Sequence, residues 1–400
     1  MSFPRWTTST VARLNYLRLI IAVAYICGIL LSFRLWFGLG RTFPRAPILS
    51  SLPPFIFAHD YLLSMALLAA LMLSAISAKR RYTVIVIALT VLLAALDLNR
   101  LQPWVFQYAI MLAALACVPS NGLNQSATSS ILAANQLVVC ALYFWSGAQK
   151  LNWSFGHEVL PNLLQPAGIH FPSTVVSWLP VLGFGVAICE MLIGIGLLWR
   201  RTRKVALATA LLMHLLLLLL LIAAWRNYVI WPWNVAMMTM VLLLFRRSDE
   251  SILRAVMMGW RKRDLAIHFP RVVFLVCGIL PALSFAGWWD LYLSAALYAG
   301  NAPVAVMRIT EATRNQLPVT ARHTVFTDSR GEFILPFYEW SMNELHVPPY
   351  PEVRVYRQMA RQLCATIDHQ DEIQLIVRER PALVDGTYKV TRTNCGALIP

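Results

Sequence analysis

Residues 142–155 read LYFWSGAQKLNWSF and close an otherwise apolar predicted helix. Lys150 places one ammonium group at the end of this helix, inside a collar that includes Trp145 and Trp153. Because a charged group in or beside hydrocarbon is costly to desolvate, Lys150 is a candidate functional residue. Gly147, one turn before it, would let a ligand or a neighbouring helix come close.

The composition places the chain in a membrane. Of its 400 residues, 58% are hydrophobic and only 13% are charged. This composition is too hydrophobic for a water-soluble globular protein. Residues 1–289 hold 23 Lys and Arg against 7 Asp and Glu, whereas residues 290–400 hold 11 against 12. The basic excess therefore belongs to membrane loops, and we expect no nucleic-acid partner.

Nine apolar segments of spanning or nearly spanning length follow one another in the first part of the chain. They cover about residues 19–37, 60–78, 83–99, 104–118, 131–150, 178–199, 205–225, 229–245 and 271–289. We therefore predict an α-helical multi-pass membrane bundle of about nine spans over residues 1–289. The first segment lacks a small-residue cleavage site, so we expect it to be retained as a span.

Loop charges predict the orientation of this bundle. The basic runs fall on the same side as the amino terminus, at residues 79–81, 200–204 and 261–263. Positively charged loops stay in the cytoplasm, so the amino terminus is expected to be cytoplasmic and the protein to lie in the cell membrane.

An odd number of spans places residues 290–400 on the side of the membrane opposite the amino terminus, which is the outer side. Apolar runs at 304–309 and 372–377 predict strands, and residues 351–364 predict a helix with proline in its first turn. We therefore predict a small extracytoplasmic α+β domain. Its two cysteines, Cys364 and Cys395, either pair as a structural disulfide in an oxidising compartment or remain unrelated thiols.

Glu190 and His214 form a second group of candidates. Each lies ten residues from the basic turn at 200–204, so each is about 15 Å from the turn, near the middle of a roughly 30 Å hydrocarbon core. A carboxylate and an imidazole at equal depth suit proton exchange. A buried interhelical hydrogen bond that fixes packing is an equally good interpretation.

Three further clusters carry less weight. The segment 226–234, with the Asn234 amide, could line a cavity with Lys150 or simply anchor the interface. Asp97 and Arg100 could pair at the outer end of the third span. The last cluster, His157, Glu158 and His170, matches no tight ligand spacing, so no metal is expected.

Residues 143–153, YFWSGAQKLNW, resemble a segment of the horizontally transferred transmembrane (HTTM) domain family, which includes vitamin K-dependent gamma-carboxylase. They are also similar to DoxX-like membrane proteins, which carry a similar glycine-to-lysine helix end. In the carboxylase, the lysine matching Lys150 is linked to hydroquinone deprotonation on the lumenal side. The resemblance covers about a dozen residues, and the carboxylase's large lumenal portion has no counterpart here. It implies a quinone-like or lipid-like molecule beside Lys150, but not protein carboxylation.

Two functions from different classes follow. In the first, the chain is a membrane enzyme in which Lys150 is the general base or charge anchor for a hydrophobic molecule near the outer leaflet. Glu190 and His214 would relay protons or bind the other end of the substrate. The substrate would lie against Trp145, Gly147, Trp153 and Asn234. In the second, the chain is a non-enzymatic scaffold or assembly factor whose outer domain recruits a protein partner. A transporter is disfavoured, because we find no inverted repeat.

Overall fold

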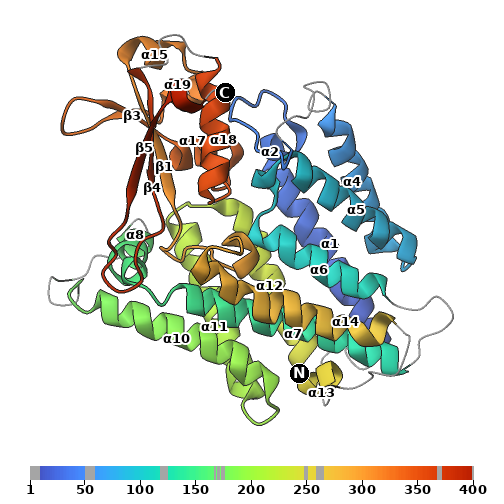
Figure 1. Cartoon of the computed structure of the whole chain (residues 1–400). Helices are drawn as coiled ribbons and strands as arrows, with labels where there is room; N and C mark the ends of the chain where they lie inside the picture. The colour runs from blue at the N-terminus through green and yellow to red at the C-terminus, as the bar shows by residue number, and fades with distance from the viewer. Residues whose placement is uncertain are drawn as a thin grey trace.

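The computed structural model describes residues 10–49, 59–117, 125–165, 168, 172, 176–246, 251–257, 265–366 and 372–398. Helices fill the first three quarters of the chain, and a sheet with further helices follows (Figure 1).

The helices of the first part have these bounds: α1 Thr10–Leu31, α2 Phe33–Phe37, α4 Asp60–Ile76, α5 Arg80–Leu96, η2 Leu98–Arg100, α6 Pro103–Ala116, α7 Gln125–Gln149, η3 Phe155–Val159, α8 Leu160–Leu164, α10 Leu179–Leu198, α11 Arg203–Ala223, η5 Tyr228–Ile230, α12 Trp231–Phe245, α13 Ile252–Met257, α14 Leu265–Val273, η6 Phe274–Ile279, η7 Leu280–Ala286 and η8 Tyr292–Ser294. The elements of the last part are β1 Val304–Ile309, α15 Glu311–Gln316, α16 Val319–Arg322, β2 Phe326–Thr327, β3 Phe333–Pro336, α17 Phe337–Leu345, α18 Val353–Cys364, β4 Gln374–Arg378, β5 Val390–Asn394 and α19 Cys395–Leu398.

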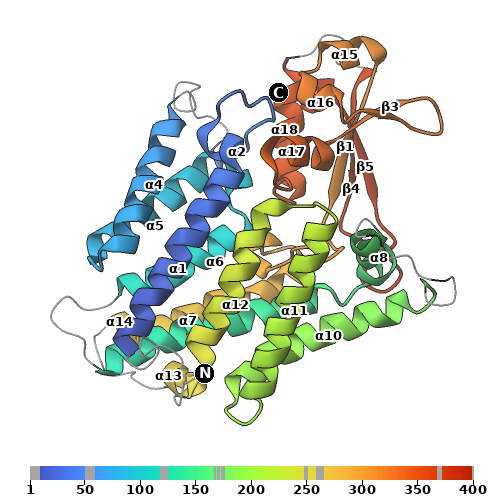
Figure 2. The same ribbon diagram turned by 180° about the vertical axis from the view of Figure 1, so that it is seen from behind.

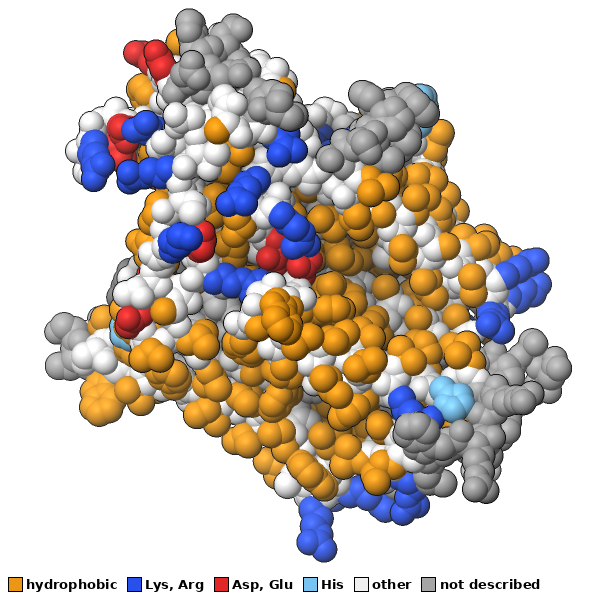
Figure 3. Space-filling model, viewed as in Figure 1, with side chains coloured by type: hydrophobic (Ala, Val, Ile, Leu, Met, Phe, Trp, Pro, Cys, Tyr) orange, Lys and Arg blue, Asp and Glu red, His pale blue; other side chains and the backbone are white. Residues whose placement is uncertain are grey.

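The chain is a multi-pass membrane protein. Within the described ranges, 6 helical segments are long and apolar enough to cross a bilayer, and α4 and α6 are shorter apolar helices. Hydrophobic side chains cover most of the bundle surface in Figure 3, whereas charged side chains gather over the sheet and at the margins. The expected count of about nine spans remains a prediction.

Helix α7 is the centre of the bundle. In the most apolar 18-residue stretch of α7, 72% of the helix is buried inside the protein. The corresponding share for α11 is 22%, so α11 faces lipid along most of its length. Helices α10 and α14 pack along α7 from two sides (Figure 1).

Glycines allow α7 and α10 to touch at the backbone. A Cβ atom on Gly194 of α10 would lie 2.5 Å from the carbonyl oxygen of Cys140 in α7, and one on Gly147 of α7 would lie 2.5 Å from that of Ala187 in α10. Such contact between small residues is the usual basis of helix association in membranes. Of the two neighbours expected beside Gly147, a ligand or a helix, the structure shows a helix, α10.

The five strands form one antiparallel sheet in the order β2-β3-β1-β4-β5. One face, which includes Met307, Leu375 and Val377, is buried against α17 and α18. The strand predicted at 304–309 is confirmed as β1. The helix predicted at 351–364 is confirmed as α18 but begins at Val353, so Pro351 precedes the helix and does not lie in its first turn. The second predicted strand, at 372–377, begins two residues later as β4.

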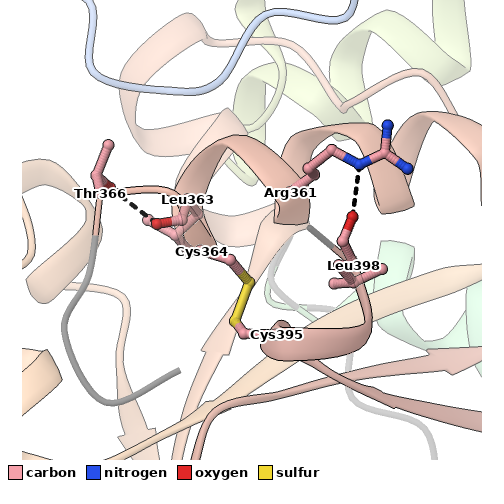
Figure 4. Close-up of a disulfide and its surroundings, with 6 residues drawn as sticks. All are labelled: Arg361, Leu363, Cys364, Thr366, Cys395 and Leu398. Atoms are coloured by element: carbon pink, nitrogen blue, oxygen red, sulfur yellow. Dashed lines mark hydrogen bonds between the residues drawn. A yellow bond between two sulfur atoms is a disulfide. The ribbon is translucent and has the colours of Figure 1, made fainter. Parts of the chain in front are cut away.

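A disulfide joins Cys364 at the end of α18 to Cys395 at the start of α19, with their Cα atoms 5.5 Å apart (Figure 4). Arg361 of α18 donates a hydrogen bond to the Leu398 carbonyl of α19, 2.7 Å away. Both links hold the last described residues against α18.

Buried carboxylates tie the loop between α2 and α4 to its surroundings. Asp60 accepts a hydrogen bond from Arg100, and Asp97 accepts one from Arg41, both at 2.5 Å. The expected pairing of Asp97 with Arg100 is therefore wrong. Each guanidinium binds the carboxylate of another element. Arg100 also donates to the carbonyls of Leu35 and Trp36 in α2.

The last part of the chain docks on the same loop through Glu344 of α17. This buried carboxylate accepts hydrogen bonds from the amides of Thr42 and Phe43, the hydroxyls of Thr42 and Thr320, and the Trp340 indole. Burial alone would raise the pKa of Glu344, but these hydrogen bonds outweigh it, so the pKa lies below its ordinary value.

Substituting glycines of α10 tests the close approach to α7. We expect Gly194→Ala to lower the free energy of unfolding by about 1–3 kcal/mol, because the new methyl group collides with α7. Gly185→Ala is the matched control, since its Cβ would meet no atom within 4 Å. Thermal unfolding in detergent measures both variants, and equal melting temperatures would contradict the packing described.

Acid should weaken the docking that Glu344 provides. Its contribution to stability is present above the ordinary pKa of a glutamate, about 4.3, and is lost as the pH falls through the lower pKa of the folded protein. We therefore expect the melting temperature to fall between pH 7 and pH 3, and the fall to be shallower in Glu344→Gln. The same pH profile in both proteins would show that Glu344 has no part in it.

Candidate functional site

Lys150 lies just past the end of α7 and forms an ion pair with Glu190 of α10. The distance from Nζ to the Glu190 carboxylate is 2.7 Å, and the two side chains are only 11% and 10% exposed. The ammonium also donates to the Ser146 hydroxyl at 2.6 Å and to the Ser146 carbonyl at 3.1 Å. Since an ammonium has three N–H donors, each of them has an acceptor.

This geometry limits the chemistry of Lys150. A general base needs an unprotonated nitrogen with a free lone pair directed at a substrate. Here the nitrogen faces a carboxylate and two oxygens of Ser146. The arrangement suits a charged ammonium that fastens α7 to α10.

His214 and Asn234 belong to a second polar chain, which starts at Tyr143 of α7. The Tyr143 hydroxyl lies 2.7 Å from Nε2 of His214 on α11, and Nδ1 of His214 lies 2.9 Å from Oδ1 of Asn234 on α12. The Asn234 amide nitrogen donates to the Ile230 carbonyl, so its oxygen is left to accept from the Nδ1–H of His214. Nε2 then accepts a hydrogen bond from the Tyr143 hydroxyl.

The expected partnership of Glu190 with His214 is thus wrong at the level of direct contact. Both side chains are buried, at 8% and 7% exposed, but they meet α7 at different turns. Glu190 bonds Lys150, and His214 bonds Tyr143, seven residues or about 10.5 Å earlier along the helix axis. Tyr143 was missed, although its spacing from Ser146 and Lys150 places all three on one helix face.

The two predicted aromatic residues of the collar face other elements than Lys150. The Trp145 indole donates to the Gly278 carbonyl of η6 at 3.2 Å. The cavity that Trp145 lines with Leu142 and Cys277 holds about 30 Å³, room for about one water molecule and too little for a quinone. Trp153 stacks on His157 with ring centroids 4.0 Å apart.

Gln149 and Asn152, on either side of Lys150, hold the chain that leads into the sheet. Gln149 accepts a hydrogen bond from Asn301 and donates one to Ser284, at 2.5 and 2.7 Å. Asn152 donates to the Ala299 carbonyl at 2.6 Å. Sequence reasoning singled out the lysine of this segment and overlooked its two amides, which are 1% and 2% exposed.

Two other expected clusters have different outcomes. The segment that ends at Asn234 does line a groove, through Trp231 and Pro232, but with α1 and α11 and not with Lys150. His157 and Glu158 lie in η3 with exposed side chains, and His170 lies outside the described residues. Within the described ranges, no group of three His, Cys, Asp or Glu side chains could hold a metal ion.

Removing the ion pair one residue at a time tests its role. Lys150→Met leaves Glu190 buried without a partner, which should cost about 3–5 kcal/mol and lower the melting temperature. The double variant Lys150→Met/Glu190→Met should recover most of that loss, because no unpaired charge remains.

Lys389→Met is the control for this pair. Lys389 lies 3.9 Å from Glu379 and is 75% exposed, so its loss should cost at most about 1 kcal/mol. A Lys150→Met protein as stable as the wild type, or a double variant no more stable than Lys150→Met, would contradict a stabilising ion pair.

Comparisons with known proteins bear on this region. The family model described as "Methylamine utilisation protein MauE" matches residues 128–232. The match includes Lys150, Glu190 and His214 and ends just before Asn234. The expected relation to the HTTM family and to DoxX-like proteins is therefore wrong, because the family whose model matches is a different membrane family. Its basis was a dozen residues around one lysine, too short a stretch to separate families. No curated protein and no solved structure matches the chain.

Proposed function

We propose that this chain is a non-enzymatic membrane scaffold of the cell membrane that serves methylamine utilisation. In this proposal the helical bundle, residues 1–289, anchors the protein, and residues 290–400 form an extracytoplasmic α+β domain that recruits a protein partner. The description of the matching family model supports the process. The observation that carries the scaffold role is the rigid attachment of the sheet and its helices to the bundle.

That attachment is made through buried polar contacts from several bundle elements. Glu344 binds the loop at Thr42, the Asn99 side chain accepts the Tyr350 amide at 3.0 Å, and Gln102 donates to the Pro348 carbonyl at 3.0 Å. At the end of α7, Asn301 donates a hydrogen bond to Gln149. A scaffold that presents a surface in a fixed orientation requires such multiple attachment.

The surface that we propose for the partner is the face of the sheet turned away from α17 and α18. Strand register places Arg308, Arg378 and Arg392 on this face together with apolar residues such as Val390. Strand β5 is also an edge strand. A face with arginines between apolar side chains favours a partner whose surface is acidic and partly apolar.

The positions of the basic residues support an extracytoplasmic location of the sheet domain. The sheet domain is attached at the bundle end formed by residues 41–47, 97–102 and 149–153. The basic residues 79–81 and 200–204 lie at the opposite ends of α5 and α10. By the positive-inside rule that opposite end is cytoplasmic.

The enzyme hypothesis has less support from the geometry. Lys150 is saturated by Glu190 and Ser146, and the cavity beside Trp145 has no room for a quinone-like molecule. The ion pair and the Tyr143–His214–Asn234 chain serve packing in the scaffold proposal.

Complementation separates the two functions. In a host that has lost growth on methylamine through deletion of this gene, the double variant Lys150→Met/Glu190→Met should restore growth. Val390→Glu should fail to restore it although the protein reaches the membrane, because a buried unpaired charge in the partner interface costs several kcal/mol.

Val319→Glu is the matched control, since Val319 of α16 is 62% exposed on the helical side and Val390 is 41% exposed on the sheet. Growth with Val390→Glu and none with the double variant would favour the enzyme instead. Normal growth of the deletion strain on methylamine would contradict a role of this protein in methylamine utilisation.

A further inference from the structure

An apolar groove of about 780 Å³ runs along the outside of the bundle between α1, α11 and α12. These three helices lie side by side in Figure 2. The walls are bulky aliphatic side chains, among them Leu19, Val23, Ile222 and Val235. The volume lies within the range of about 300–1,000 Å³ that is usual for ligand pockets.

One end of the groove is aromatic and basic. Trp225, Tyr228 and Trp231 line it there, and Trp225 is 73% exposed. Trp and Tyr of this kind mark the headgroup depth of a bilayer. This end is also the end of α1, close to the C-terminal helix α17, since the ring of His346 lies 5.1 Å from the ring of Tyr228.

Two arginines lie close in the chain to the residues that line this end. Arg226 lies between Trp225 and Tyr228 in the chain, and Arg34 follows the last groove residue of α1, Leu31, by three positions. Burial, the largest cause, lowers the pKa of His346, and the positive charge of Arg34 acts in the same direction.

Both arginines are available to a ligand. Their side chains are exposed, and within the part of the chain that the structure describes neither guanidinium group forms a hydrogen bond or ion pair. The other arginines near this end, Arg41, Arg45 and Arg100, are used by Asp60 and Asp97. Two exposed arginines next to an apolar groove whose aromatic end marks headgroup depth suit a phosphate attached to long apolar chains.

We infer that this groove binds an anionic phospholipid, with its phosphate on Arg34 and Arg226 and an acyl chain along α1 and α12. The site lies apart from Lys150 and depends on no part of the proposed function. A transmembrane helix of a partner suits the groove less well, because helix association in membranes favours small lining residues, whereas most residues here are bulky.

Lipid titration of the purified full-length protein, followed by native mass spectrometry, tests the inference. Phosphatidylglycerol should bind roughly tenfold more tightly than phosphatidylcholine, because two cations near the surface favour the anionic headgroup. Arg34→Gln/Arg226→Gln should remove this preference. Val235→Trp should weaken binding of both lipids, because Val235 lines the groove and is 49% exposed.

Arg80→Gln/Arg81→Gln controls for general electrostatics, since it removes the same charge from exposed residues at the start of α5. This variant should keep the preference for phosphatidylglycerol. Equal binding of the two lipids by the wild type, or the same loss of preference in the control, would overturn the inference. So would a dimer that Val235→Trp disrupts, because a second copy would then occupy the groove.

Discussion

The pairing of Lys150 with Glu190 is the interaction on which the arrangement of the bundle depends. Both groups sit among apolar helices, where an unpaired charge is costly, and they meet at 2.7 Å with all three ammonium donors used. The glycines at 147 and 194 bring α7 and α10 close enough for this contact. Once α7 is fixed against α10, the residues at the end of α7 are in place to hold the sheet.

The end of α7 connects three parts of the molecule because successive residues form hydrogen bonds in different directions. Lys150 reaches α10, Gln149 reaches Ser284 and Asn301, and the amide of Trp153 donates to the Leu383 carbonyl at 2.8 Å. The segment is therefore a junction between the bundle and the sheet. This placement explains, without any catalytic step, why so many polar groups follow an apolar helix.

Much of the fold could be predicted from the sequence, since apolar length indicates helices and short apolar runs indicate the strands at β1 and β4. The candidate residues Lys150, Glu190 and His214 were also found, because ionisable side chains are conspicuous among apolar ones. Their partners could not be predicted. Distance from a turn gives the depth of a residue in the bundle, but not the direction in which its side chain points. Glu190 and His214 lie equally far along the chain from the turn at 200–204, yet they bond different residues of α7.

The contacts of Tyr143, Gln149 and Asn152 depend on how distant segments pack, so local sequence offered little beyond helical spacing. The central claim concerns Lys150, and a high-resolution cryo-EM map of the protein in a lipid nanodisc tests it most directly. We predict continuous density between the Lys150 amine and the Glu190 carboxylate, at hydrogen-bonding distance. A Lys150 side chain that points into a cavity holding a ligand, with Glu190 bonded elsewhere, would contradict it.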